Sequence, residues 1–157
     1  MASAIPMPLL NTYHRRIQVG ASRRRLEDAR ACLEKGRWIA AIYLGGYAVE
    51  CALKAYICLQ EGKDDFRETQ VYQQGAVVGR AGHNLQTLYN AAGAPVLRSM
   101  FNPHGEFHRA RQLVVKTWYP QDNLRYSHRS GKRAEAEAFV RAVEMLHGFL
   151  LELQGER

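Results

Sequence analysis

The sequence has few cysteines, no long uncharged hydrophobic run and no stretch of alternating polar and apolar residues. Its three cysteines, Cys32, Cys51 and Cys58, are odd in number and lack the spacing of metal ligands. This pattern disfavours a disulfide framework or a zinc site and favours small core residues. We therefore expect no metal and no cofactor, and the reducing cytoplasm as the compartment.

Signals for secretion and for membrane insertion are also missing. The most apolar segment contains an uncharged run of 12 residues, from Trp38 to Val49, whereas a helix needs about 20 to span a bilayer. The first ten residues contain two prolines and no basic residue, which is unlike a signal peptide. These features predict a core helix rather than a membrane span, and a protein without a membrane partner.

Several common signatures of catalysis are absent as well. We find no glycine-rich phosphate loop, nucleophile elbow or catalytic carboxylate pair in the sequence. The Gly45-Gly46 pair lies inside the apolar segment rather than after a strand, so it does not form a dinucleotide-binding loop. His104 and His108 have a spacing that can hold zinc on a helix, but the sequence offers no obvious third ligand.

What the sequence does contain is hydrophobic periodicity of the helical kind. It predicts an all-α fold, an antiparallel bundle of about five helices in one domain over residues 19–157, after a flexible N-terminal arm over residues 1–18. The expected helices are Ser22–Lys35, Trp38–Leu59, Asn84–Ala92, Asn102–Trp118 and Ser130–Leu153. The segment 62–82 contains four glycines, and we expect a loop there with one short helical turn near residues 68–73.

The apolar segment carries only two charges, Glu50 and Lys54, which are four residues apart and can pair along a helix. Such a pair is either buried among apolar residues or turned toward the mouth of the bundle. An active-site role is the alternative. The spacing alone favours a structural pair.

Positive charge is concentrated in the second half of the chain. The whole sequence has a net charge of +7, and the window from Arg98 to Arg133 contains eight Lys or Arg against two acids. Histidines and aromatic residues are interleaved with these cations, a composition typical of surfaces that bind nucleic acid. The alternative is a set of solvated helix faces. The candidate phosphate-binding residues are His108, Arg109, Arg111, Arg125 and His128.

Three segments together resemble one known family. Residues 47–55 have the sequence YAVECALKA, residues 82–88 match the pattern GHNLxxL, and residues 124–126 are LRY in the loop before the last helix. In this order they are similar to HEPN domains over roughly Ser22 to Leu153. The resemblance implies a helical bundle, a homodimer, and RNA or a nucleotide as the ligand. It also implies a nucleotidyltransferase partner protein and a role of toxin–antitoxin or defence type.

Many HEPN proteins are metal-independent endoribonucleases with an arginine followed, four to six residues later, by a histidine. Arg98 and His104 fit that form, and a helix beginning at Asn102 would place His104 in its first turn. Arg141 and His147 also fit it, but they lie inside the last amphipathic helix, where we attribute the match to chance. The resemblance implies that His104 is the base and that Arg98 stabilises the phosphate.

The Arg125-Tyr126 loop resembles a HEPN branch that often lacks this ribonuclease signature. Ser127-His128 stands where that branch often has a proline and an acid. Two functions therefore remain open: an RNA- or nucleotide-binding domain with ribonuclease activity, and a non-catalytic dimeric module that binds a protein partner.

Overall fold

The protein is built from helices, as a computed structural model shows. The structure describes residues 12–93, 96, 98, 102, 104–118 and 121–156, and these residues contain no strand. The elements are α1 (Arg15–Glu34), α2 (Trp38–Glu61), η1 (Phe66–Glu68), α3 (Gln70–Gln73), η2 (Gly79–His83), α4 (Leu85–Ala92), α6 (Glu106–Trp118), α7 (Asp122–Arg125) and α8 (Arg133–Leu153). The predicted all-α fold is confirmed.

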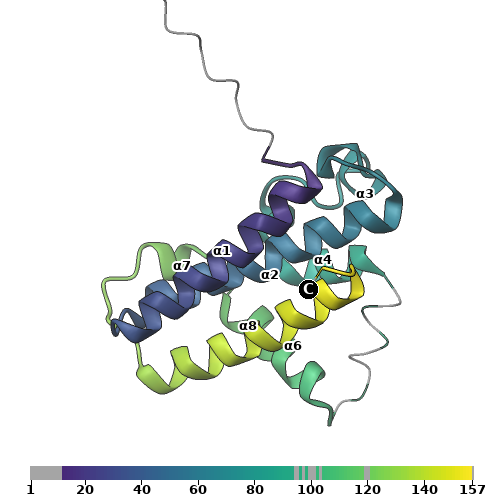
Figure 1. The fold of residues 1–157 in the computed structure, drawn as a ribbon. Coiled ribbons are helices and arrows are strands. Elements are labelled where there is room, and N and C mark those ends of the chain that lie inside the picture. Colours follow the sequence, from purple (N-terminus) through teal and green to yellow (C-terminus); the bar gives the residue numbers. More distant parts are fainter. Residues whose placement is uncertain are drawn as a thin grey trace, which may run out of the picture.

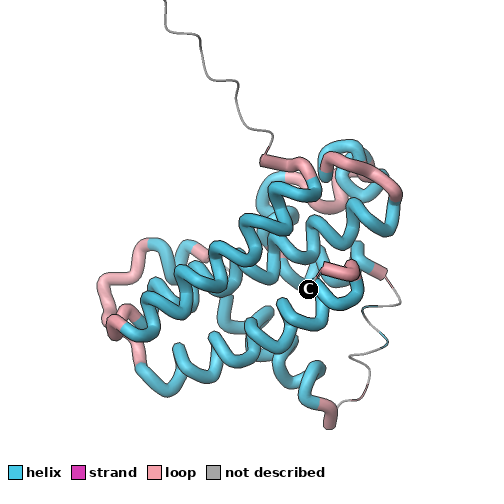
Figure 2. Tube along the Cα trace, in the orientation of Figure 1, coloured by secondary structure: helices cyan, strands magenta, loops and turns pink. Residues whose placement is uncertain are grey.

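The first two long helices form an antiparallel hairpin. Gly36, with a φ of 70°, supplies the left-handed residue that ends α1 and turns the chain into α2. Figure 1 shows α1 and α2 lying along each other, with α8 below them. Figure 2 shows that loops mainly occupy the ends of the bundle, so the helices themselves provide its long faces.

Helix α2 is the centre of the molecule, as predicted for a core helix. Fourteen of its 24 residues are buried, and α1, α4, α6 and α8 all pack against it. By length and composition α2 could cross a membrane, but 72% of its most apolar window is buried inside the fold. The apolar surface of α2 is therefore covered by the other helices.

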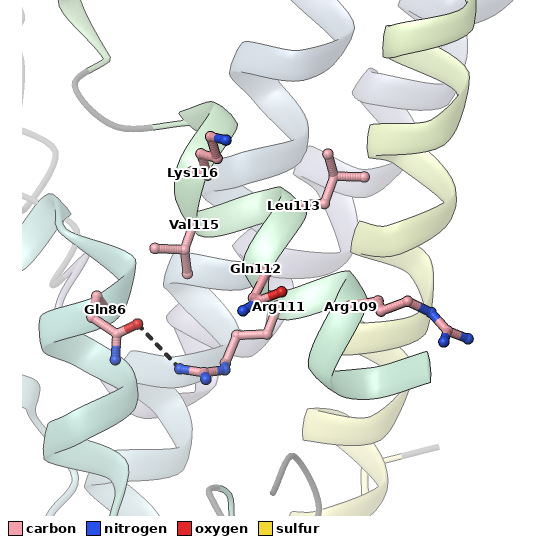
Figure 3. Close-up of a pocket in the computed structure, with 7 residues that line it drawn as sticks. All are labelled: Gln86, Arg109, Arg111, Gln112, Leu113, Val115 and Lys116. Atoms are coloured by element: carbon pink, nitrogen blue, oxygen red, sulfur yellow. Dashed lines mark hydrogen bonds between the residues drawn. The ribbon is translucent and has the colours of Figure 1, made fainter. Parts of the chain in front are cut away.

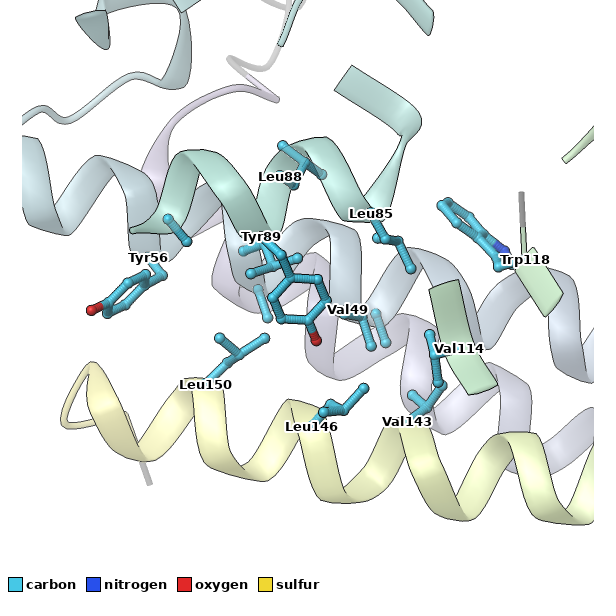
Figure 4. Close-up of a cluster of buried hydrophobic side chains, with 14 of the residues drawn as sticks. Val49, Tyr56, Leu85, Leu88, Tyr89, Val114, Trp118, Val143, Leu146 and Leu150 are labelled. Carbon is cyan, nitrogen blue, oxygen red and sulfur yellow. The ribbon is translucent and has the colours of Figure 1, made fainter. Parts of the chain in front are cut away.

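The core cluster joins α2 to the second half of the chain. Figure 4 shows side chains of α4, α6 and α8 converging on those of α2. Trp118 at the end of α6 is fully buried, and its Nε1 donates a hydrogen bond to the backbone oxygen of Tyr43, 2.9 Å away. Gly46 on α2 provides the space for this indole.

Three helices begin at residues other than those predicted. Helix α1 begins at Arg15 instead of Ser22, because the side chain of His14 accepts a hydrogen bond from the Arg16 amide and Arg15 bonds to the backbone oxygen of Asp64. Helix α8 begins at Arg133 instead of Ser130, after Gly131 with a φ of 76°. Residues 1–11 of the predicted arm lie outside the described residues.

Helix α6 begins at Glu106, four residues after the predicted N-cap. The side chain of Asn102 accepts a hydrogen bond from the amide of His104, and its backbone oxygen accepts one from Gly105. These bonds form a turn that precedes the helix. His104 therefore lies before α6 rather than in its first turn, which corrects that prediction.

The segments expected to be loops contain short helices. Within residues 62–82 the structure has η1, α3 and most of η2, of which only the turn near α3 was predicted. Helix α7 lies in the predicted loop after α6. In contrast, α4 begins as predicted, because the side chain of Asn84 accepts hydrogen bonds from the amides of Gln86 and Thr87.

Candidate nucleic-acid interface

A basic groove lies along α4 and α6. It has a volume of about 610 Å³ and is lined by Gln86, Arg109, Arg111, Gln112, Leu113, Val115 and Lys116. Figure 3 shows Arg111 extending toward α4, while Arg109 extends away from α4. The lining contains three cations and no acid. Such a surface can bind an anion and can hydrogen-bond through its two amide side chains.

Arg111 is held in place within this groove. Its Nη1 donates a hydrogen bond to Oε1 of Gln86, 3.1 Å away, and its guanidinium carbon lies 6.0 Å from the centre of the Tyr89 ring. Among the described residues, no carboxylate forms an ion pair with Arg111. Its charge is therefore fixed in position and uncompensated by an acid.

Of the two residues predicted to be catalytic, His104 lies in the turn that precedes α6, whereas Arg98 lies further back in the chain, before the undescribed residues 99–101. Arg98 and His104 are both exposed. The backbone oxygen of His104 accepts a hydrogen bond from Nη1 of Arg109, 2.7 Å away. Ser99 and Pro103, which belong to the predicted motif, lie outside the described residues. His108 is half-buried in the first turn of α6.

Arg125 and His128 lie beyond the other end of α6. This helix has 13 residues, so at 1.5 Å per residue about 20 Å separate its two ends. The structure thus places Arg125 and His104 of the chain at opposite ends of α6, although both were predicted to contact the same ligand. His128 is exposed in the loop before α8.

Arg125 instead joins a pair of tyrosines on α2. Its Nε donates to the hydroxyl of Tyr43 at 3.3 Å, and the hydroxyls of Tyr43 and Tyr47 are 3.3 Å apart. The hydrogen bond to Tyr47, and the nearby Arg125, lower the pKa of Tyr43. Burial and the hydrogen bond to Tyr43 raise the pKa of Tyr47 to about 12.

The pair Glu50 and Lys54 lies one turn further along α2. Glu50 is 3% and Lys54 is 7% exposed, and Nζ of Lys54 is 2.6 Å from Oε1 of Glu50. The same carboxylate oxygen is 3.0 Å from Nδ1 of His83. The rings of His83 and Tyr47 lie edge to face, with centres 6.5 Å apart. The tyrosine pair and the charged pair thus form one continuous polar cluster.

His147, in the pattern attributed to chance, is a core residue. It is 5% exposed, and its Nε2 lies 3.0 Å from the hydroxyl of Ser22 on α1. Burial lowers the pKa of His147 to about 4, with smaller contributions from Arg23 and Arg30. Its environment supports packing rather than catalysis.

His83, which joins the charged pair to the tyrosine pair, was not among the site residues predicted from the sequence. In the sequence His83 stands next to Asn84 before a predicted helix, a position that by itself favours capping or packing. Two of the three segments that resemble the HEPN family contain Glu50 and His83, respectively. Their joint presence was the only sequence signal that these two residues lie together. Among the residues that the structure describes, no group of three His, Cys, Asp or Glu could hold a metal ion.

These observations define the class of the protein: it is a helical bundle with a central apolar helix and a basic groove. The chain belongs to the HEPN domain family, because the family model for the HEPN domain matches residues 19–153. No curated protein and no solved structure matches the chain. HEPN domains commonly dimerise and bind nucleotides, so membership indicates a function related to nucleotides or RNA.

Proposed function

We propose that the protein is a cytoplasmic homodimeric HEPN domain that binds RNA through the groove between α4 and α6. The observation that carries this proposal is the lining of the groove, which has Arg109, Arg111 and Lys116 and no acid. Phosphates bind such cations and release counterions on binding. The fixed position of Arg111 adds to the binding, because its side chain needs little further ordering.

The experiment measures binding of a labelled single-stranded RNA by fluorescence anisotropy as salt is raised from about 50 mM. The affinity should fall steeply with salt. Changing Arg111 and Lys116 together to Gln should weaken binding at every salt concentration and reduce the salt slope by about 1 to 2, since each phosphate contact contributes about 0.7 for a single strand.

The matched control is Arg24→Gln on α1. Arg24 is exposed and pairs with Glu27 three residues away, so this change removes one cation outside the groove. Its salt slope should stay near that of the wild type. Absence of RNA binding by the wild type at low salt would exclude this function.

Ribonuclease activity at Arg98 and His104 is part of the proposal. The exposure of both side chains supports it, because each could reach an RNA strand bound outside the bundle. His104→Ala should lower the cleavage rate by about two to four orders of magnitude with little loss of affinity. Arg98→Ala should reduce both rate and affinity. Chelators should leave cleavage unchanged, and the products should end in a 2′,3′-cyclic phosphate.

The second candidate is a non-catalytic module that binds a protein, such as a nucleotidyltransferase partner in a toxin–antitoxin pair. The apolar side chains of Leu113 and Val115 in the same groove favour it. A stoichiometric complex with such a partner, purified without nucleic acid, would support this candidate. The ratio of absorbance at 260 and 280 nm distinguishes the two.

A further inference from the structure

His83 is a half-exposed side chain held by groups that are themselves buried. The exposed fraction of its side chain is 51%, whereas that of the Glu50 side chain is 4%. Gln121 donates a hydrogen bond from Nε2 to the backbone oxygen of His83, 2.6 Å away. The following residue, Asn84, caps α4. The ring and the backbone of His83 are therefore both fixed, although the ring borders solvent.

The carboxylate of Glu50 determines which ring nitrogen of His83 is available. Oε1 of Glu50 accepts a hydrogen bond from Lys54 and lies 3.0 Å from Nδ1 of His83. A carboxylate only accepts, so Nδ1 carries the proton and donates it. In the neutral ring Nε2 then has a free lone pair. Lys54 already balances the charge of Glu50. The contact between His83 and Glu50 is therefore not needed to neutralise the carboxylate, and its effect is to orient the ring of His83.

Arg125 brings a cation to the same cluster. It is exposed, and no acid forms an ion pair with it among the residues that the structure describes. The hydroxyl of Tyr43 accepts a hydrogen bond from its Nε, and Tyr43 in turn contacts Tyr47. Tyr47 packs edge to face against His83. An anion bound by Arg125 would thus lie on the side of α2 where His83 lies.

We propose that His83 is an acid–base residue acting on the phosphodiester of RNA, with Glu50 as its positioning residue and Arg125 as the phosphate-binding cation. This inference rests on the proposed RNA binding. It assigns the chemistry of cleavage to a centre at the opposite end of α6 from His104, as the alternative to cleavage by Arg98 and His104. The ligand is RNA rather than DNA, because the step requires a ribose 2′-hydroxyl.

The step is a transesterification. The 2′-hydroxyl gives its proton to Nε2 of His83 while its oxygen forms a bond to phosphorus, and the bond from phosphorus to the 5′ oxygen breaks. The 5′ oxygen takes a proton from water, and His83 returns its proton to solvent. The products are a 2′,3′-cyclic phosphate and a 5′-hydroxyl, so the reaction is an internal transfer that needs no co-reactant. Arg125 stabilises the charge that develops on the phosphoryl oxygens.

The test compares His83→Gln with the wild type on a labelled single-stranded RNA. Glutamine keeps an N–H that can donate to Glu50 but cannot take a proton, so the fold and the affinity for RNA should be retained. The cleavage rate should fall by about two to four orders of magnitude. Arg125→Gln should raise KM and lower kcat, and Arg24→Gln on α1 should change neither. RNA with 2′-O-methyl groups should bind and resist cleavage.

The pH–rate profile separates chemistry from structural support. A general base must be unprotonated to act, so the rate of the wild type should fall on the acid side, and this fall should be missing from the residual activity of His83→Gln. The groups that face His83 are Glu50, Lys54 and Tyr47 on α2, with Gln121 at its backbone. In the double variant Glu50→Gln/Lys54→Met, nitrogen NMR should show a mixture of His83 tautomers, and the rate should fall about tenfold or more.

Each outcome decides between the two assignments. Loss of cleavage in His83→Gln, with affinity intact, supports this inference. The inference is overturned if His83→Gln still cleaves RNA, or if only His104→Ala abolishes cleavage. It is also overturned if the wild type does not cleave RNA. If the wild type binds RNA without cleaving it, the proposed binding function stands and this inference fails. If it binds no RNA, the proposed function fails first.

Discussion

Two histidines of this chain show how surroundings decide the role of a side chain. His147 is enclosed between α1 and α8. There the hydroxyl of Ser22 donates to the backbone oxygen of Val19, so His147 must donate from Nε2 to that hydroxyl. His83 has a carboxylate partner and borders solvent. The first histidine is therefore kept neutral by the core, and the second keeps one nitrogen free for a ligand.

His147 makes the stability of the protein sensitive to acid. Its pKa is lowered from 6.5 to about 4 in the folded state, mainly by burial. The unfolded chain therefore binds the proton first as the pH falls. The stabilisation is complete above about pH 6.5 and is lost as the pH falls toward 4, by about 3 kcal/mol in total.

Urea unfolding of the wild type and of His147→Gln at pH 7, 5 and 4 measures this effect. Other groups contribute equally to both proteins, so the difference between their unfolding free energies reports on His147. The loss between about pH 6.5 and 4 should be smaller in the variant by roughly 2 to 3 kcal/mol. Parallel curves for the two proteins would contradict the assignment.

The buried pair on α2 gives a second prediction at this scale. Lys54→Met leaves the carboxylate of Glu50 buried without its cation and should lower the free energy of unfolding by about 3 to 5 kcal/mol. Glu50→Gln/Lys54→Met removes both charges and should stay near the wild type. Denaturant unfolding of the three proteins checks the order. Equal stability of Lys54→Met and the double variant would contradict the prediction that the buried Glu50 carboxylate requires the charge of Lys54.

At the scale of the elements, the crossing of α2 and α6 depends on Gly46. A Cβ at this position would overlap the indole of Trp118, whose Nε1 also bonds to the backbone of α2. Gly45 is less tight, since its Cβ would lie 3.2 Å from the ring of Phe139 on α8. The glycine pair thus lets two neighbouring helices approach the central one.

Gly46→Ala should lower the free energy of unfolding by about 1 to 3 kcal/mol, because either Trp118 or the backbone of α2 must move. The matched control is Gly20→Ala in α1, where an added Cβ meets nothing within 4 Å. That change should stabilise the protein by about 0.5 to 1 kcal/mol through helix propensity. Thermal unfolding of both variants is the measurement, and a harmless Gly46→Ala would contradict the packing of α6.

At the scale of the whole molecule, the arrangement separates two basic regions. The groove with Arg111 lies along α4 and α6, and the cluster with Arg125 lies where α7 meets α2. A bound RNA strand could contact both, because an RNA strand extends over several phosphates. The net charge of +7 attracts such a strand before any specific contact forms.

We expect the protein to be a homodimer in solution. HEPN domains commonly dimerise, and pairing would bring a second set of these basic residues to one RNA. Light scattering at micromolar concentration should give a mass of about twice the 17.8 kDa of the chain. A mass of one chain would contradict the dimer, and RNA binding by that monomer would show that pairing is not needed.

The sequence by itself determined the helical fold, the central position of α2 and the beginning of α4. These features depend on local rules: apolar residues recur at the helical period in 38–59, and Asn84 satisfies amides two and three residues away. When a side chain contacts only residues close to it in the sequence, that contact can be predicted from the sequence alone.

Only the tertiary structure decided which polar groups meet. Glu50 and His83 are 33 residues apart, and Tyr43 and Arg125 are 82 residues apart. Helix α1 likewise begins early because Arg15 bonds to Asp64, far along the chain. Such contacts depend on how whole helices pack, and no local pattern specifies that packing. The sequence therefore identified the HEPN bundle, and the packing of α2 against η2 and α7 determined where its polar cluster lies.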